Sequence, residues 1–248
     1  MSVDGSLPTF ITIGTMKGGT SALHNYLREH PQVGMSKPKE TDFFCRPDHG
    51  GRDLAWYRGL FSGPGRAFGE SSPNYTKRHV YDGVVERMHA LLPDIRLIFL
   101  ARDPIDRAVS HFLHNVAKGR MRRDDFSAYF DDLDNHALLT SRYHYQLEPF
   151  VRAYGLERIL VMASEDLRND RAAALKRVFG FIGVDPEFTS PRFTVDRHLT
   201  SDMMAKAGES LDRPVLAERQ LAAIVDHLRP DIDRFRALLG LPFVSWSV

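Results

Sequence analysis

The residues best suited to chemistry in this chain form the run Lys17-Gly18-Gly19-Thr20-Ser21. They follow the apolar run 10–13 and open a helical pattern of apolar residues at 22–27. Glycines between a strand and a helix let backbone N–H groups approach an anion closely, and the N-terminus of the helix adds partial positive charge. Lysine supplies a point charge with three donors. This segment therefore predicts an anion-binding loop.

The order of residues in the loop differs from that of a site for a nucleoside triphosphate with Mg²⁺. A Walker A loop has the pattern G-x-x-x-x-G-K-[ST], in which the lysine follows the last glycine and the next hydroxyl binds Mg²⁺. Here Lys17 precedes Gly18 and Gly19. We therefore expect a nucleotide phosphate site and no metal site.

A second anion site is predicted where the apolar strand 95–101 ends. Arg102 follows this strand, Asp103 and Pro104 suit the N-cap and first position of a helix over 104–117, and Ser110 lies about two turns into that helix. An arginine fork and a hydroxyl are good phosphate ligands. Two such sites suit a nucleotide with phosphates at both ends of its ribose.

Apolar runs of strand length alternate with amphipathic helical patterns along the chain, which is typical of a parallel sheet covered on both faces. Strands are expected at 10–14, 67–70, 95–101 and 159–162, and helices at 80–91, 104–117, 141–154, 172–182 and 216–239, with Pro230 as a candidate break in the last. The segment 118–135 is expected to be a solvated excursion, or alternatively a mobile flap over a substrate cleft.

The fold class is therefore α/β, a P-loop-like parallel β-sheet flanked by helices on both faces. We expect a single domain over 1–248, with a cofactor-binding core at 9–183 and a helical part at 184–248. Ligands of such sheets bind at the carboxyl ends of the strands. The loops at 14–21, 36–44, 70–76 and 102–110 should therefore line one site.

Composition limits the partners and the compartment. The 248 residues include 33 Lys+Arg and 32 Asp+Glu, so a nucleic-acid binder that works through bulk charge is excluded. The single cysteine, Cys45, allows no intrachain disulfide and is compatible with a reducing compartment. No apolar run approaches the ~20 residues that cross a membrane, and the first eight positions lack the features of a signal peptide. A cytoplasmic protein without a membrane span is expected.

Several segments together resemble the PAPS-dependent sulfotransferase superfamily, as a bacterial-type member similar to the heparan sulfate sulfotransferase branch (PAPS is 3′-phosphoadenosine-5′-phosphosulfate). Residues 13–21 resemble its 5′-phosphosulfate loop and 98–110 its 3′-phosphate motif. The run KPKETDFF at 37–44 resembles a K-E-x-x-F-F segment, and ESSPNY at 70–75 resembles the substrate-side E-K-[ST]-P-x-Y segment. The segments RYxxQL at 142–147 and EDL at 165–167 also resemble motifs of this family.

The resemblance implies an enzyme that moves a sulfuryl group from PAPS by in-line displacement, without a metal, and releases 3′-phosphoadenosine-5′-phosphate (PAP). The acceptor would be a hydroxyl, or secondarily an amine, of a small molecule, lipid or carbohydrate. Lys17 would stabilise the leaving phosphate, Gly18, Gly19, Thr20 and Ser21 would hold the 5′-phosphate, and Arg102 and Ser110 the 3′-phosphate. Lys39, Ser71, Ser72 and Tyr143 are candidate substrate contacts.

Glu40 is the candidate general base for the acceptor. Burial would favour this role by raising its pKa toward neutrality, whereas Lys37 or Lys39 nearby would oppose that shift. Asp42, His111 and His198 are alternative bases.

Two departures argue against heparan sulfate as the acceptor. Ser71 stands where the family has a lysine that could touch an acidic sugar, and a single cysteine excludes the disulfide loop of the animal enzymes. The family also has a C-terminal segment that covers the cofactor, and residues 195–204 of this chain resemble it only loosely. The alternative functions are a P-loop-type nucleotide or small-molecule kinase, which needs a Lys-[ST] pair that the first loop lacks, and a noncatalytic PAP-binding protein.

Overall fold

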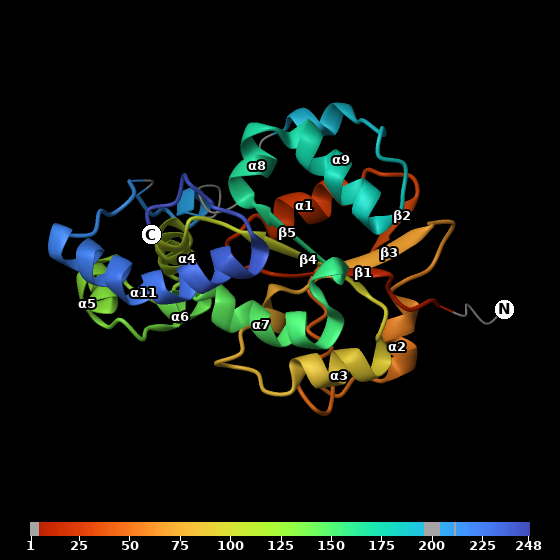
Figure 1. The fold of residues 1–248 in the computed structure, drawn as a ribbon, viewed down its shortest axis with the longest axis horizontal. Helices are drawn as coiled ribbons and strands as arrows, with labels where there is room; N and C mark the ends of the chain where they lie inside the picture. Colours follow the sequence, from red (N-terminus) through yellow and green to blue (C-terminus); the bar gives the residue numbers. More distant parts are fainter. Residues whose placement is uncertain (1–4, 196–203, 211) are drawn as a thin grey trace. The chain divides into compact units, whose positions relative to one another are not determined.

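The structure, a computed structural model, describes residues 5–195, 204–210 and 212–248 (Figure 1). The chain divides into two compact units. The first comprises Met1–Ala101 and Leu147–Val195, and the second comprises Arg102–Gln146 and Asp196–Val248. The expectation of a single domain stays a prediction.

The first unit is built on a five-stranded parallel sheet in the order β2-β3-β1-β4-β5. Its strands are β1 (Phe10–Gly14), β2 (Val33–Met35), β3 (Ala67–Ser71), β4 (Arg96–Ala101) and β5 (Ile159–Ala163). Every residue of β1 and β3 is buried. A strand covered on both faces has no polar side, which is why β1 and β4 could be recognised as nearly continuous apolar runs.

Helices cover both faces of this sheet. In Figure 1, α1 (Thr20–Leu27), α8 (Ser164–Asn169) and α9 (Arg171–Ile182) lie on one face, and α3 (Val84–Leu91) and the part of α7 (Tyr143–Tyr154) from Leu147 onward lie on the other. A core cluster joins the sheet to α1 and α9 through Leu23, Leu100 and Val178, which are fully buried. The predicted α/β fold with a covered parallel sheet is confirmed.

Several short elements of the first unit were not predicted. These are β2, with three residues, and α2 (Leu54–Gly59) and α8, with six each. They are too short to show a period in the sequence. The helix expected from residue 80 begins only at Val84, because Gly83 at its N-cap has a left-handed φ of 68°. Short 3₁₀ turns lie at Pro73–Thr76, Leu156–Arg158 and Pro191–Thr194.

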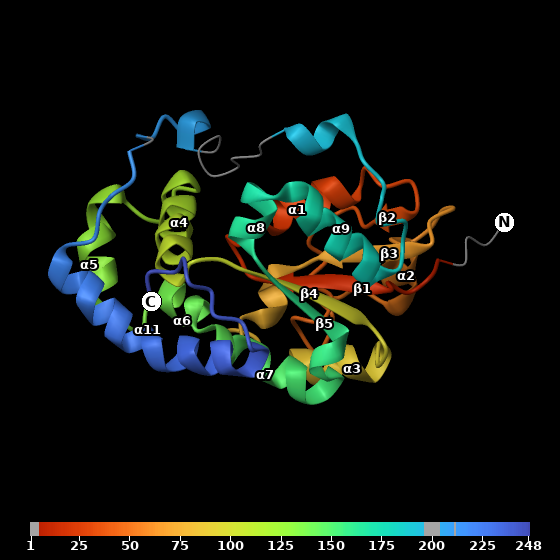
Figure 2. The ribbon, with the colours of Figure 1, turned by 45° about the horizontal axis from the view of Figure 1, so that its top comes forward.

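The second unit is helical. It contains α4 (Pro104–Ala117), a 3₁₀ turn at Arg123–Asp125, α5 (Phe126–Asp131), α6 (His136–Ser141), the start of α7 and α11 (Glu218–Leu239) (Figure 2). The buried Arg107 guanidinium ties α4 to α6 by donating to Ser141 Oγ (2.7 Å) and to the carbonyl of Ala137. Burial lowers the pKa of Arg107 to about 10.

The helix expected over 141–154 is present as α7 and begins two residues later, at Tyr143. Two other predictions for this unit were wrong. The segment 118–135 is not merely solvated, because Phe126 and Phe130 of α5 are buried and Phe126 packs on Phe112. Helix α11 is not broken at Pro230, because one buried apolar stripe runs past the proline and compensates for the lost hydrogen bond; its residues are Ile224, Leu228, Ile232 and Phe235.

The start of α7 depends on α11. The Asp231 carboxylate accepts hydrogen bonds from the backbone N–H groups of His144 and Tyr145, both at 2.9 Å. It therefore caps α7 from a residue far along the chain. Among the residues that the structure describes, no helix is both long and apolar enough to span a membrane.

Candidate functional site

The predicted anion loop joins β1 to α1 in the first unit. It rests against β4, since Thr15 N–H donates to the Leu100 carbonyl (3.0 Å). A Cβ on Gly18 would lie 2.4 Å from that same carbonyl oxygen, so only glycine fits here. Gly19 has a φ of 96° and is the N-cap of α1. The two glycines therefore bring backbone N–H groups to the carboxyl end of the sheet.

The start of α1 is suited to an external anion. Its N-cap offers no side-chain hydrogen bond and its first turn holds no acidic residue, so no carboxylate of the helix neutralises its partial positive charge. Thr20 is buried, whereas Ser21 and Lys17 are partly exposed. Lys17 lies in the left-handed region at a φ of 69°. The loop has the shape of a phosphate site, and the roles of its individual residues stay predictions.

Glu40 does not meet the condition of burial. Its side chain is 45% exposed, and its Oε1 lies 2.6 Å from Lys39 Nζ. The lysine that was expected to oppose protonation of this carboxylate is therefore its direct partner. Glu40 is open to an acceptor from solvent, and its role as base stays a prediction.

Asp42, the alternative base, has a more enclosed carboxylate. Asn74 Nδ2 donates to its Oδ2 (2.9 Å), while Oδ1 is buried without a partner among the described residues. Burial raises the pKa of Asp42. Its backbone is left-handed, with a φ of 51°, a conformation that costs energy in a residue with a side chain. A half-satisfied carboxylate on a strained turn is a credible proton acceptor.

Glu70 is the residue that the sequence did not single out. It lies near the end of β3, is fully buried, and accepts hydrogen bonds from four hydroxyl groups that come from α2, a loop, and the 3₁₀ turn after β3 with its N-cap. Tyr57 (2.7 Å) and Tyr75 (3.0 Å) donate to Oε1, and Thr41 and Ser72 (both 2.5 Å) donate to Oε2. Burial raises the pKa of Glu70, and these donors oppose the rise because they stabilise the ionised form.

Glu70 and its four hydroxyl donors form a hydrogen-bonded hub, and this hub reaches the turn 40–42, which carries both candidate bases. Ser72 Oγ accepts from the backbone N–H groups of Thr41 (2.9 Å) and Asp42 (3.2 Å) while donating to Glu70. The predicted substrate residue Ser72 is thus fully buried and holds the turn 40–42. Its contact with a substrate stays a prediction.

Ser71 is also fully buried, and its Oγ lies 3.1 Å from Nδ1 of His24 on α1. Burial, followed by the nearby charges of Lys39 and Arg28, lowers the pKa of His24 to about 3. His24 is therefore neutral near pH 7. The serine that replaces the family's lysine at this position is engaged by a neutral imidazole.

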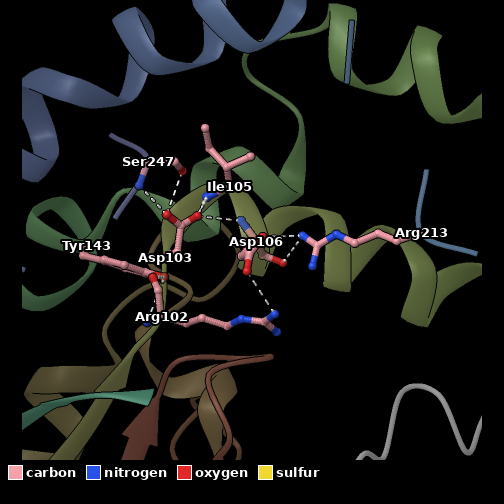
Figure 3. Close-up of polar contacts among 7 residues, drawn as sticks. All are labelled: Arg102, Asp103, Ile105, Asp106, Tyr143, Arg213 and Ser247. Carbon is pink, nitrogen blue, oxygen red and sulfur yellow. Dashed lines mark hydrogen bonds and ion pairs between the residues drawn. The ribbon is translucent and has the colours of Figure 1, made fainter. Parts of the chain in front are cut away.

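The predicted 3′-phosphate residues, Arg102 and Ser110, lie in the second unit. Figure 3 shows Arg102 with its neighbours Asp106 and Tyr143. Arg102 directly follows β4, and its Nη2 lies 3.5 Å from Asp106 Oδ2, whose other oxygen pairs with Arg213 Nη2 at 2.6 Å. The Arg102 Nε is buried without a partner among the described atoms. Ser110 is buried on α4. A buried guanidinium N–H without an acceptor fits an anionic ligand such as a phosphate.

Tyr143 holds the backbone of Arg102. Its hydroxyl donates to the Arg102 carbonyl (2.6 Å) and accepts from the Arg102 N–H (3.4 Å). Since Tyr143 is fully buried, its observed contact is with the arginine, and its contact with a substrate stays a prediction.

The other candidate bases are less informative. His111 is buried on α4 with its ring 5.1 Å from that of His136. His198, and 196–203 of the segment matched to a cofactor-covering loop, lie outside the described residues. Within the described ranges, no three His, Cys, Asp or Glu side chains are grouped so as to hold a metal ion.

Comparison with known proteins agrees with this geometry. The profile of the family described as "sulfotransferase domain" matches residues 7–210. Heparan sulfate glucosamine 3-O-sulfotransferase 3B1 of Mus musculus is 31% identical over 97% of this chain and 65% of its own length. Heparan sulfate glucosamine 3-O-sulfotransferase 6 of the same species is 31% identical over 97% of this chain and 74% of its own. The chain thus spans just under two thirds of the first of these relatives.

Among solved structures, a sulfotransferase from Alicyclobacillus acidocaldarius has the same fold. It matches with a TM-score of 0.78 over 98% of this chain and 100% of its own, at 24% identity.

Proposed function

The chain belongs to the sulfotransferase family, and from this premise we propose that it transfers a sulfuryl group from PAPS to a hydroxyl, or secondarily an amine, of an acceptor and releases PAP. The observation that carries the proposal is the loop between β1 and α1. It presents Lys17, two close-packed glycines and a helix start without a side-chain cap, and it has no Lys-[ST] pair for Mg²⁺. These features favour PAPS over the nucleoside triphosphate of a kinase.

In this proposal, PAPS supplies the sulfuryl group on a phosphate leaving group, and fixed donors of the chain stabilise the charge that develops there. Lys17 donates to the leaving phosphate. Gly18, Gly19, Thr20 and Ser21 hold that phosphate from the start of α1. Arg102 and Ser110 hold the 3′-phosphate of the same nucleotide, and the buried Nε of Arg102 supports this assignment.

Glu40 takes the proton of the acceptor in this proposal. Its exposure supports access to a hydroxyl from solvent, and its ion pair with Lys39 at 2.6 Å orients it. Asp42 is the competing group, because its buried Oδ1 has no donor among the residues that the structure describes. The removal of a working general base typically slows turnover about 10²–10⁴-fold. Glu40→Gln and Asp42→Asn, made one at a time, therefore show which carboxylate is the base.

The acceptor class is proposed as a hydroxyl-bearing carbohydrate, lipid or other small molecule. The names of the curated relatives point to a carbohydrate, heparan sulfate. We propose a less acidic acceptor for this chain, because Ser71 takes the place of a lysine and is bound to a neutral His24. A cytoplasmic location remains part of the proposal, supported by the single cysteine.

Calorimetric binding of PAP, with ATP plus Mg²⁺ as the comparison, tests this proposal. We expect tight binding of PAP that does not depend on Mg²⁺ and is weakened by Arg102→Ala. A preference for ATP with Mg²⁺ would instead favour the kinase. PAP binding without sulfate transfer to any acceptor in a screen with PAPS would favour the noncatalytic alternative.

A further inference from the structure

The last residues of the chain, 243–248, form a strap over the start of α4 in the second unit. Ser247 makes two hydrogen bonds to Oδ2 of Asp103, from its backbone N–H (2.5 Å) and from its hydroxyl (2.7 Å) (Figure 3). The other oxygen of Asp103 caps α4 by accepting from the N–H groups of Ile105 (3.0 Å) and Asp106 (2.8 Å). A buried N-cap carboxylate is thus satisfied on one side by the helix and on the other by the strap.

The strap also packs against the residue that holds Arg102. The Trp246 ring is buried and lies 5.6 Å from the Tyr143 ring, and it stacks on Phe243 at 4.2 Å. Tyr143 in turn binds both backbone polar groups of Arg102. The strap therefore contacts the Asp103 carboxylate, next to Arg102 in the chain, and the Tyr143 side chain, which binds the Arg102 backbone.

Helix α11 fastens the strap. Arg236 donates from Nη2 to the Val248 carbonyl (2.6 Å) and from Nε to the Pro242 carbonyl (2.9 Å). The Trp246 ring lies nearly parallel to that of Phe235, at 6.2 Å and 12°. These contacts come from groups other than Asp103, so the strap has anchors of its own.

We propose that this strap is a positioning device for Arg102, acting through Ser247 on Asp103 and through Trp246 on Tyr143. The inference rests on the proposed function, in which Arg102 binds the 3′-phosphate of the nucleotide. Among the described residues, the guanidinium has only a 3.5 Å ion pair with Asp106 to orient it, so its direction depends on where its backbone is held. Without the Ser247 donors, Asp103 Oδ2 loses two hydrogen bonds. That loss is costly for a buried carboxylate and favours a shift of the turn 102–104.

The test compares two nucleotides, PAP and adenosine 5′-phosphate, which lacks the 3′-phosphate. Ser247→Ala removes one of the two donors to Asp103, and we expect it to weaken PAP binding roughly three- to tenfold, in line with the net contribution of one typical hydrogen bond. Binding of adenosine 5′-phosphate should not change. Ser245→Ala, at an exposed serine of the same strap, is the matched control and should change neither affinity.

Two further variants separate positioning from stability. Ser247→Thr keeps the hydroxyl and should retain PAP affinity. Ser247→Val, whose side chain has nearly the shape of threonine but no hydroxyl, should lose it. Thermal unfolding of both variants measures their stability. In an Arg102→Ala background, Ser247→Ala should have no further effect on PAP binding.

Each outcome decides between the two hypotheses. If the unmodified protein shows no preference for PAP over adenosine 5′-phosphate, both the 3′-phosphate site and the strap proposal fail. If that preference exists but Ser247→Ala weakens both nucleotides equally, or neither, the strap is only a structural element and the proposed function stands.

Discussion

Replacement of Glu70 by Gln should destabilise the protein more than an isosteric change usually does. The carboxylate accepts hydroxyl protons on both oxygens, from Tyr57 and Tyr75 on Oε1 and from Thr41 and Ser72 on Oε2. An amide turns one acceptor into a double donor. Whichever way the amide is placed, its NH₂ group then faces two hydroxyl groups that already point their protons inward.

The magnitude follows from the partners of Ser72. Its Oγ already accepts from the N–H groups of Thr41 and Asp42, so it has no lone pair left for an amide N–H. If the NH₂ group replaces Oε2, one amide hydrogen and the Ser72 hydroxyl proton both lose their acceptors. A buried unsatisfied polar group costs about 1–3 kcal/mol. Since the change also removes a buried charge, whose desolvation offsets part of this cost, we expect a net loss of about 2–4 kcal/mol.

Urea unfolding followed by circular dichroism measures this loss in Glu70→Gln. Tyr57→Phe is the control, because it removes one donor and leaves the carboxylate satisfied by the others; it should cost about 0.5–1.5 kcal/mol. If Glu70→Gln is as stable as the unmodified protein, or less destabilised than Tyr57→Phe, the hub is not the ionised acceptor that the geometry indicates.

Three further predictions concern the first unit. Lys17→Ala should abolish sulfuryl transfer in a PAPS assay, because the charge at the leaving phosphate is lost, and near-normal turnover would overturn the assignment of the loop. Glu40→Gln should lower kcat about 10²–10⁴-fold with PAP affinity retained; an unchanged kcat, with the loss appearing in Asp42→Asn, would move the base to Asp42. His24, with its pKa lowered from 6.5 to about 3, takes up its proton near pH 6.5 only when the chain is unfolded. Stability should therefore fall by about 1.4 kcal/mol per pH unit below 6.5, or roughly 2 kcal/mol from pH 7 to 5. His24→Gln should remove this component from the unfolding free energies at the two pH values, and an identical pH dependence in both proteins would show that His24 titrates normally.

Local sequence signals identified the parts of the fold whose physics is local. The run 10–14 is a strand with the predicted bounds because both of its faces are buried and every residue must be compatible with a core. Helix 104–117 also has the predicted bounds, because an N-cap carboxylate and a proline at the first helical position are adjacent in the chain. The glycines and lysine of the first loop could likewise be assigned, since strand, turn and helix start follow one another directly.

Contacts between distant residues could not be read in this way. Glu70 is one letter of a motif, and its four hydroxyl partners lie on α2, in the loop at residue 41, and in the 3₁₀ turn after β3 together with its N-cap. Glu40 and Asp42 are two residues apart and equally acidic in the sequence. Only the packing around them decides that Glu40 faces solvent beside Lys39 while Asp42 is enclosed.

The sequence by itself therefore determined the α/β fold, the two anion-binding motifs and the family, because these depend on apolar periodicity and on residues that are neighbours along the chain. The tertiary structure alone decided which carboxylate is buried, that His24 is neutral, and that Ser247 completes the cap at Asp103, 144 residues away. Burial and long-range hydrogen bonds set the charge state and direction of a side chain, and both depend on parts of the chain that meet only after folding.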